Sequence, residues 1–190
     1  MKDWFEKITI GTAVDRAAAT FRSHTAIRFC GQGWTFRDLQ AEVNRAACGL
    51  LNCGIQPGDK VALWLLNRPE WLHIWLAVAK IGAVLVPINT WFRTNDLAYV
   101  LRQSDSTTLI TADHSGPIGY LDMVRQLLPQ LDTCSEPNQL ELEDFPALRR
   151  VITVSEEAYT GTQRWTDVTA AGKAVSAADL AARQETIDPD

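Results

Sequence analysis

Residues 54–106 constrain the fold more than any other part of this sequence, because strand and helix patterns alternate there with little sequence between them. The continuous apolar run at residues 61–66 is typical of a strand covered by helices on both faces. Residues 70–81 are apolar almost all round, as in a helix buried on more than one side, and residues 84–88 return as a second apolar strand. We therefore predict a βαβ unit with a right-handed crossover, within an α/β fold of partial layered type whose successive βα units build a mainly parallel sheet.

The flanking sequence continues this alternation of strands and helices. Thr35, with Asp38 three residues later, forms a capping-box pattern that predicts the start of a helix ending at Gly54. Asn67 is predicted to cap the buried helix, whose first turn contains Pro69. The other predicted elements are helices over residues 12–22, 94–103 (capped by Thr94), 116–131, 166–171 and 177–183, strands over 25–30, 107–111 and 148–154, a short antiparallel arm at 34–35, and an exposed loop over 134–146.

The length of 190 residues is enough for one ordinary domain with its own core. We divide the chain into an N-terminal helix over residues 1–24, an α/β domain over residues 25–183, and a polar linker over residues 184–190. A second complete domain is not expected.

Charge and apolar patterning exclude several classes of function. The net charge is −5 and the arginines are scattered, so no basic face for nucleic acid is predicted. The first 23 residues lack the uninterrupted apolar core of a signal peptide, and Arg68, Glu70 and Lys80 interrupt the most apolar region, so no transmembrane segment is predicted and we expect a cytoplasmic protein. The four cysteines show neither C-x-x-C pairs nor metal-finger spacing, which favours reduced, mostly packed thiols.

Two glycine-containing turns could in principle cradle a phosphate. Gly31 and Gly33 lie between a predicted strand and a helix, but a dinucleotide fingerprint requires Gly or Ala where Phe36 stands, which favours a plain turn. The segment Tyr159 to Gln163 combines hydroxyl groups with Gly161 but lacks a lysine to meet phosphate charge. We do not predict a ligand site at either turn.

The residues that could act as acids, bases or ligands are dispersed along the sequence. His24, His73 and His114 are far apart, and His73 is interpreted as a core or interface imidazole with one hydrogen-bond partner. Trp71 and Trp75 have the helical spacing of core residues. The acidic run of Glu141, Glu143 and Asp144 is most simply a solvated loop, and neither a nucleophile elbow nor a metal-ligand spacing is present.

Short sequence blocks carry a resemblance to a known family. They are residues 34–39, 54–59, 67–70, 77–83, 86–89 and 97–104, followed by residues 127–131 and 145–151. In this order and spacing they resemble the N-terminal portion of the AMP-forming acyl-CoA synthetases of the adenylate-forming superfamily, and the last two blocks are similar to fatty- and cyclic-acid CoA ligases. The resemblance runs from about Thr12 to the end of the chain, so that residues 25–183 read as a partial AMP-dependent synthetase/ligase N-terminal domain and residues 184–190 as a linker or truncation point.

The resemblance implies a two-step ligase that uses ATP and Mg²⁺ to convert a carboxylic acid to an acyl-adenylate and then transfers the acyl group to coenzyme A. The family's Ser/Thr/Gly-rich phosphate loop ending in Pro-Lys-Gly, its Tyr-Gly-x-Thr-Glu segment, its ribose-binding Asp and its adenylation lysine have no counterpart in this sequence. No catalytic, cofactor-binding or metal-binding residue of the family can therefore be carried over to this chain. We expect a scaffold fragment that is inactive alone, binds no cofactor alone, and works with the remainder of the ligase.

Two alternatives remain open from the sequence. The first is a non-catalytic α/β binding or interaction module that completes a site with a partner chain, favoured by apolar elements that need covering on several sides. The second is an unrelated nucleotide-binding α/β domain.

Overall fold

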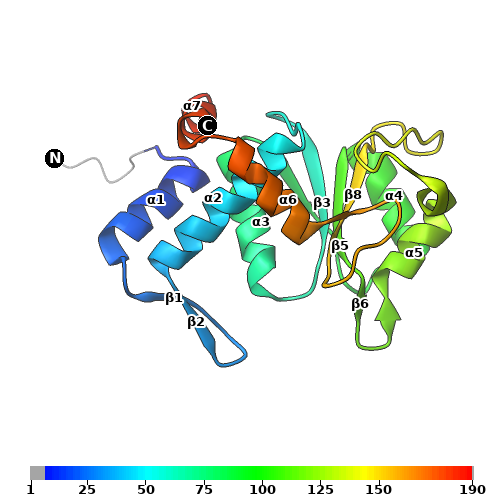
Figure 1. Cartoon of the computed structure of the whole chain (residues 1–190), viewed down its shortest axis with the longest axis horizontal. Helices are drawn as coiled ribbons and strands as arrows, with labels where there is room; N and C mark the ends of the chain where they lie inside the picture. The colour runs from blue at the N-terminus through cyan, green and yellow to red at the C-terminus, as the bar shows by residue number, and fades with distance from the viewer. Residues whose placement is uncertain (1–6, 190) are drawn as a thin grey trace.

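The computed structural model describes residues 7–189, and its centre is a parallel sheet with strands in the spatial order β4-β3-β5-β8-β9 (Figure 1). Every neighbouring pair in this sheet is parallel. The strands are β3 (Lys60–Trp64), β4 (Val84–Pro87), β5 (Thr108–Ala112), β8 (Arg150–Val154) and β9 (Gln163–Arg164). This arrangement confirms the predicted α/β fold with a mainly parallel sheet built from successive βα units.

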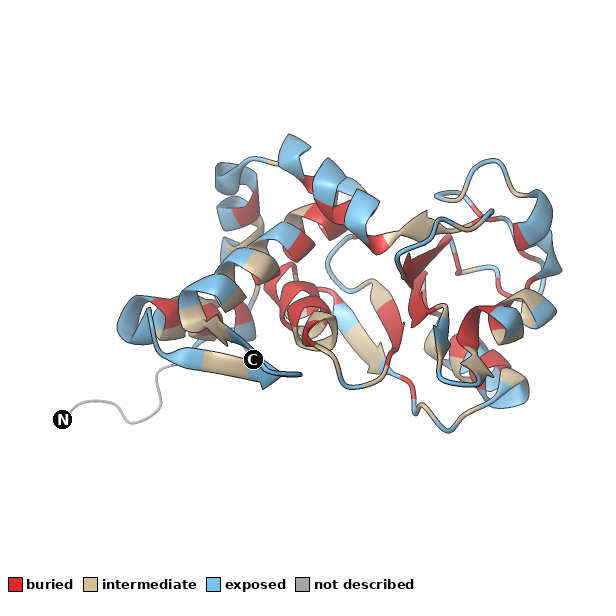
Figure 2. Ribbon diagram, turned by 60° about the horizontal axis from the view of Figure 1, so that its bottom comes forward, coloured by how far each residue is buried: buried red, intermediate tan, exposed pale blue. Residues whose placement is uncertain are grey.

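Helices cover both faces of the sheet, as the apolar strand at residues 61–66 predicts. In Figure 1, α1, α2, α3 and α6 lie on one side of the strands and α4 and α5 on the other. Figure 2 shows the buried residues gathered along the sheet and on the helix faces that pack against it. The helices are α1 (Ile10–Phe21), α2 (Phe36–Asn52), α3 (Pro69–Lys80), α4 (Thr94–Ser104), α5 (Tyr120–Leu127), α6 (Trp165–Ala171) and α7 (Ala177–Glu185), with 3₁₀ turns at η1 (Pro129–Thr133) and η2 (Gly172–Ala174).

Two antiparallel hairpins lie outside the large sheet. Strands β1 (Thr25–Phe29) and β2 (Gln32–Thr35) form the first, and Gly31 adopts a positive φ of 81° in its turn with open space around it. The predicted turn is confirmed at Gly31, whereas Gly33 lies within β2 and is paired with Arg28, so the hairpin arm begins two residues earlier than predicted. The second hairpin joins β6 (His114–Ser115) to β7 (Ile118–Gly119).

A pair of aromatic side chains fixes the connection between β4 and α4. Trp64 is fully buried, and its ring meets that of Tyr120 edge-on with the centroids 4.7 Å apart. Trp64 Nε1 donates a hydrogen bond to the Asn89 carbonyl at 3.1 Å, and the Tyr120 hydroxyl donates to the Thr90 carbonyl at 3.1 Å. Each polar tip thus finds a backbone acceptor while the ring stays in the core.

Helix α2 and the α6–η2 segment approach so closely that only glycine fits between them. A Cβ added at Gly49 would lie 2.8 Å from the Val168 carbonyl oxygen, and one at Gly172 would lie 2.5 Å from the Gly49 nitrogen. Real Cβ atoms do not approach backbone atoms this closely, so the absence of side chains at these two positions sets the distance between the two segments.

Helices α2 and α3 begin where predicted, but the predicted capping residue is correct only for α2. The capping box of α2 is present, with Thr35 Oγ1 accepting from the Asp38 amide and the Asp38 carboxylate accepting from the Thr35 amide. The predicted cap at Asn67 is wrong, because the N-cap of α3 is Arg68, which makes no side-chain capping bond, and Pro69 occupies the first helical position. Pro69 lacks an N–H, so fewer donors need capping there.

The start of α4 differs from the prediction in the same way. Its N-cap is Arg93, and Thr94 is already helical. The Arg93 amide donates to the Asp96 carboxylate at 3.0 Å, which shows that the acidic residue in the first turn secures this helix end.

The predicted helix over residues 116–131 is wrong in its first and last parts. Gly116 has a positive φ of 55°, and with Pro117 it turns the chain into the β6–β7 hairpin, so α5 begins only at Tyr120. Leu128 then leaves the helical region and Pro129 opens a 3₁₀ turn.

The loop over residues 134–146 is irregular, as predicted, but it is not exposed throughout. Its acidic residues Glu141, Glu143 and Asp144 are exposed, in agreement with a solvated run. Leu140, Leu142 and Phe145 are buried and belong to the main core. Because its apolar side chains are buried in the core, the loop packs against the domain, and only its polar side chains face the solvent.

The two ends of the described chain pack against each other. Helix α1 accounts for the predicted N-terminal helix, of which residues 1–6 lie outside the described residues, as does residue 190 of the predicted linker. Helix α7 continues to Glu185, and Gln184 Nε2 donates to Thr12 Oγ1 and to the Asp15 carboxylate at 3.3 and 3.1 Å. No helix within residues 7–189 is long and apolar enough to span a bilayer.

Candidate functional site

The order of the strands creates a crevice at one edge of the large sheet. The chain runs from β3 through α3 to β4 on one side of β3, and later returns to the other side of β3 to form β5. In open parallel sheets, ligands bind where the connections leave two adjacent strands in opposite directions, outside the carboxyl ends of these strands. The carboxyl ends of β3 and β5 therefore mark the most favourable binding position in this fold.

A cleft of about 700 Å³ occupies this position, and we call it the switch-point cleft. It is lined by residues that follow β3, by the first turn of α3, and by residues at the end of β5 and in β6. Helix α2, the α6–η2 segment and the β1–β2 hairpin supply the rest of the lining. Its volume lies in the range of natural small-molecule sites, roughly 300 to 1,000 Å³.

An ion pair holds the first turn of α3 at the cleft. Arg68 Nε and Nη2 donate to the two Glu70 carboxylate oxygens at 2.8 and 2.9 Å. Burial alone would raise the pKa of Glu70, but the hydrogen bonds from Arg68 outweigh it and hold the pKa below its ordinary value. Arg68 and Glu70 therefore remain charged and largely neutralise each other.

His73 lies one turn further along α3 and is 6% exposed. Burial disfavours the imidazolium and lowers the pKa of His73 below its ordinary value, although Glu42 and Glu70 act in the opposite direction. Its Nε2 atom is buried and has no hydrogen-bond partner within residues 7–189. The interpretation of His73 as a buried imidazole is confirmed, but the single hydrogen-bond partner predicted for it is not found among the described residues.

The other two histidines differ in position. His114 lines the switch-point cleft together with His73, although the sequence suggested isolated residues. His114 Nδ1 lies 3.1 Å from the Asp113 carboxylate, which also accepts a hydrogen bond from the Tyr159 hydroxyl at 3.1 Å. His24 is outside the cleft, with its Nδ1 atom 3.0 Å from the Phe21 carbonyl oxygen.

The remaining sequence candidates have structural explanations. Gly161, in the segment Tyr159 to Gln163, has a positive φ of 73°, and a Cβ there would lie 2.1 Å from the Leu131 carbonyl oxygen, so close backbone packing accounts for the glycine. Trp71 and Trp75 are half-buried and pack against the core, with ring centroids 5.9 Å apart. The cysteines of the described chain are free thiols, of which Cys30 is exposed and the others are partly buried.

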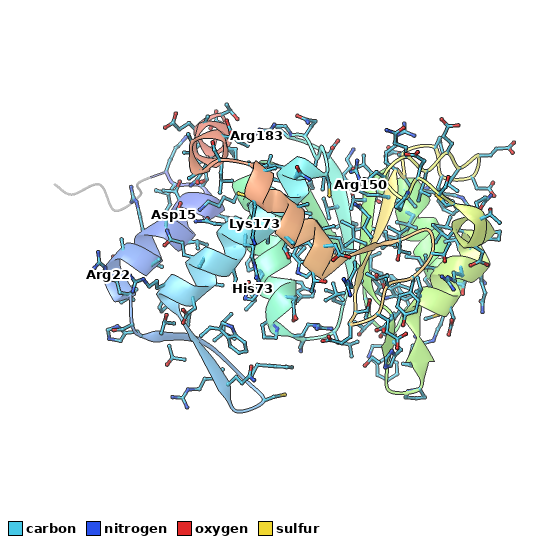
Figure 3. The ribbon with its side chains drawn as sticks, in the orientation of Figure 1. Asp15, Arg22, His73, Arg150, Lys173 and Arg183 are labelled. Atoms are coloured by element: carbon cyan, nitrogen blue, oxygen red, sulfur yellow. The ribbon has the colours of Figure 1, made fainter. Side chains whose placement is uncertain are left out.

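Several cleft residues were missed by the sequence reasoning. Trp165, Thr169 and Lys173 come from α6 and η2, and Arg45 comes from α2. Figure 3 shows Lys173 and His73 in the same central part of the molecule, although they belong to elements far apart in the sequence. No local pattern marks these residues, because only the packing of α6 beside α2 brings them to the cleft.

The cleft does not fit a nucleoside triphosphate with its metal ion. Arg68 is paired with Glu70 and Arg45 with Glu42, so Lys173 is left as the one lining Lys or Arg side chain without a described partner. A polyphosphate carries several negative charges and is held by multiple cations and backbone donors. Among residues 7–189, no group of three or more His, Cys, Asp or Glu side chains could hold a metal ion. We therefore assign no step involving ATP or Mg²⁺ to these residues.

The sheet order and its covering helices define the α/β fold of the N-terminal subdomain of adenylate-forming enzymes. The chain belongs to the family described as AMP-binding enzyme, whose model matches residues 14–189. It is 34% identical over 184 residues to YngI of Bacillus subtilis (strain 168), which is provisionally named an acyl-CoA synthetase, with 96% of this chain and 33% of YngI covered.

Two further relatives support this assignment. The medium-chain acyl-CoA ligase ACSF2, mitochondrial, of Mus musculus is 32% identical over 166 residues, which cover 86% of this chain and 27% of ACSF2. A crystal structure from Rhodopseudomonas palustris, provisionally named a long-chain-fatty-acid CoA ligase, superimposes with a TM-score of 0.70 at 26% identity and covers 86% of this chain and 36% of that one. The chain thus spans about a third of the length of the curated relatives it matches.

Proposed function

We propose that this chain forms the N-terminal scaffold of an acid-CoA ligase. Such an enzyme joins a carboxylate to ATP, releasing pyrophosphate, and then transfers the acyl group of the adenylate to the thiol of coenzyme A, releasing AMP. The observation that supports this role is the family match over residues 14–189, with relatives named as acyl-CoA synthetases and ligases. Cytoplasmic residence is part of the same proposal.

We further propose that the 190-residue chain has no ligase activity by itself. The sequence contains no Ser/Thr/Gly-rich loop ending in Pro-Lys-Gly, and the switch-point cleft offers one unpaired lysine where adenylyl transfer needs several fixed cations and donors. In this proposal ATP, Mg²⁺ and coenzyme A are bound by other parts of a complete ligase, and this chain supplies the layers that support them.

A chimera tests the scaffold role. The chain is joined to the part of YngI that follows the segment matched by this chain, and acyl-CoA formation is measured with a panel of carboxylic acids. We expect thioester formation by the chimera, and none by either half alone. A folded but inactive chimera, measured beside active full-length YngI, would argue against the scaffold role. ATP–pyrophosphate exchange by the purified chain above background would overturn the proposed inactivity.

Three exposed apolar side chains favour a second candidate, in which the chain is a non-catalytic module that completes a site with a separate partner chain. Val84 on the edge strand β4 is 48% exposed, Trp91 is 82% exposed and Tyr99 on α4 is 66% exposed. Large exposed apolar side chains such as these are available for contact with a partner.

Mixing this chain with the separate remainder of YngI, without a covalent link, distinguishes the scaffold from the partner-chain module. Formation of a one-to-one complex with activity in trans, weakened by Trp91→Ser, would support the partner-chain form. Activity that appears only in the covalent chimera would support a scaffold that works within one polypeptide.

A further inference from the structure

The buried imidazole of His73 is incompletely paired. Only 6% of His73 is exposed, and its Nε2 atom is buried without a hydrogen-bond partner within residues 7–189. Such atoms are rare in folded proteins, because they lose their hydration without compensation. A neutral imidazole can leave one nitrogen as an unused acceptor, whereas an imidazolium has an N–H donor on both nitrogens. Protonated His73 therefore has a buried N–H at Nε2 that needs an acceptor.

Helix α2 supplies a carboxylate that can act as this acceptor. Helices α2 and α3 pack side by side (Figure 1), and Glu42 on α2 lines the switch-point cleft together with His73. Glu42 Oε2 accepts from the Arg45 guanidinium, and its Oε1 atom makes no hydrogen bond with a described residue. The Arg45 side chain is 58% exposed, and exposed ion pairs of this kind hold their partners weakly. The Glu42 carboxylate can therefore turn toward His73.

The other charged groups around His73 are less suited to this role. Glu70, three residues earlier on α3, already accepts from Arg68 through both carboxylate oxygens. Asp15 of α1 is bonded to Lys80 at the far end of α3. Strand β4, which also packs on α3, has no ionisable side chain in its sequence. The remaining basic side chains that line the cleft cannot accept a hydrogen bond in their charged form, and they are Arg45, Lys173 and His114.

The electrostatics around the imidazole favour the same partner. Burial lowers the pKa of His73 below its ordinary value, so the imidazole is neutral at neutral pH. Two carboxylates act against this desolvation, and the effect of Glu42 is larger than that of Glu70. The imidazolium that forms in mild acid is therefore stabilised most by the carboxylate on α2.

We propose that His73 and Glu42 form an acid-triggered clasp between α3 and α2, in which the protonated imidazole donates a hydrogen bond from Nε2 to the Glu42 carboxylate. A hydrogen bond between two charged groups is stronger than a neutral one, and it exists only while the imidazole holds its second proton. Both helices line the switch-point cleft, so the clasp fixes this part of the lining in acid and releases it at neutral pH. The clasp uses residues of this chain alone and does not depend on the proposed ligase function.

An NMR titration of the unmodified chain tests the proposal without any substitution. The pH is lowered from about 8 to about 5, where free carboxylates remain largely ionised, and the His73 ring nitrogens are followed together with the Glu42 and Glu70 carboxyl carbons. We expect the Glu42 carbon to shift with the same midpoint as His73, and the Glu70 carbon to shift less. A Glu42 signal that does not change through the His73 midpoint, or changes no more than that of Glu70, would overturn the clasp. A His73 ring that stays neutral down to about pH 5 would also overturn it.

Variants assign the bond to the named carboxylate. Glu42→Gln is expected to lower the His73 midpoint at least about twice as far as Glu70→Gln, because it removes a charge-assisted hydrogen bond as well as a charge. Asp167→Asn, at an exposed pair outside the cleft, is the control and should leave the midpoint unchanged. Equal decreases in Glu42→Gln and Glu70→Gln, with both chains folded by circular dichroism, would show a general field effect and refute the assignment to Glu42.

Discussion

The ion pair between Lys80 and Asp15 gives the sharpest stability prediction. The Lys80 side chain is 3% exposed, and its Nζ donates to both Asp15 carboxylate oxygens at 2.7 and 2.9 Å. The substitution Asp15→Asn leaves a buried ammonium without its counter-charge. Breaking a buried pair from one side costs about 3 to 5 kcal/mol, and we expect about 3 kcal/mol here because the partner carboxylate is partly exposed. The Asp15 side chain is 33% exposed.

A double-mutant cycle measures this energy by urea denaturation of the unmodified chain, the two single variants Asp15→Asn and Lys80→Met, and the double variant. Asp15→Asn is expected to lower the unfolding midpoint strongly, and Lys80→Met only slightly, because Gln40 and Gln184 still donate hydrogen bonds to the Asp15 carboxylate. The double variant is expected to be more stable than Asp15→Asn alone, since a buried pair can be replaced by apolar groups at little cost. Asp167→Asn, at an exposed pair with Arg164, is the matched control and should leave the midpoint unchanged.

The same carboxylate predicts a dependence on acid. Burial alone would raise the pKa of Asp15, but the hydrogen bonds from Gln40, Lys80 and Gln184 outweigh it, so the folded pKa lies below the ordinary value of 3.8. This stabilisation is therefore complete above pH 3.8 and is lost as the pH falls through the folded pKa. A midpoint that is the same in Asp15→Asn and the unmodified chain, with unchanged circular dichroism, would refute this account of the pair.

Three further predictions concern other parts of the fold. The His73 pKa, measured by NMR, should lie below its ordinary value of 6.5, so that the chain loses stability as the pH falls from 6.5 toward the folded pKa. Gly49→Ala should cost about 1 to 3 kcal/mol in urea denaturation, because its Cβ would press on the Val168 carbonyl 2.8 Å away. Thr35→Ala should cost about 1 kcal/mol by the same assay, since it removes the side-chain acceptor of the α2 capping box.

Each of these three predictions would be contradicted by a specific result. A His73 pKa above 6.5 would mean that the imidazole is not desolvated as described. Gly33→Ala is the control for Gly49, because its nearest non-local neighbour would be 3.9 Å away, and equal losses at the two sites would refute the close-contact argument. Stability unchanged in Thr35→Ala would show that water replaces the cap at no cost.

Local periodicity was sufficient to predict most of the sheet. The apolar run at residues 61–66 and the helix at 70–81 correspond to β3 and α3, because burial on both faces leaves a continuous apolar signal that does not depend on distant residues. The prediction of a helix over residues 116–131 was wrong because its local pattern is compatible with a second structure. Its apolar spacing fits a helix, but the pairing of His114 with Gly119 across a turn at Gly116 offers the backbone an alternative.

The cleft could not be predicted from the sequence, since it depends on strand order. Whether β5 lies beside β3 or beside β4 is a tertiary choice, and the crevice exists because it lies beside β3. Lys173 and His73 line the same cleft only after α6 has packed on α2. The sequence-based expectation that no residue here has a catalytic, cofactor-binding or metal-binding role, and the expectation that the chain does not bind nucleic acid, stay predictions.

The glycine contact between α2 and the α6–η2 segment has a consequence for the shape of the cleft. Both segments line the switch-point cleft, and the absence of side chains at Gly49 and Gly172 sets how closely they pack. A relative with Ala or Ser at either position would have to hold the two segments further apart, so the cleft would change shape although every residue that lines it stayed the same. The shape of the cleft would then depend on two positions that do not line it.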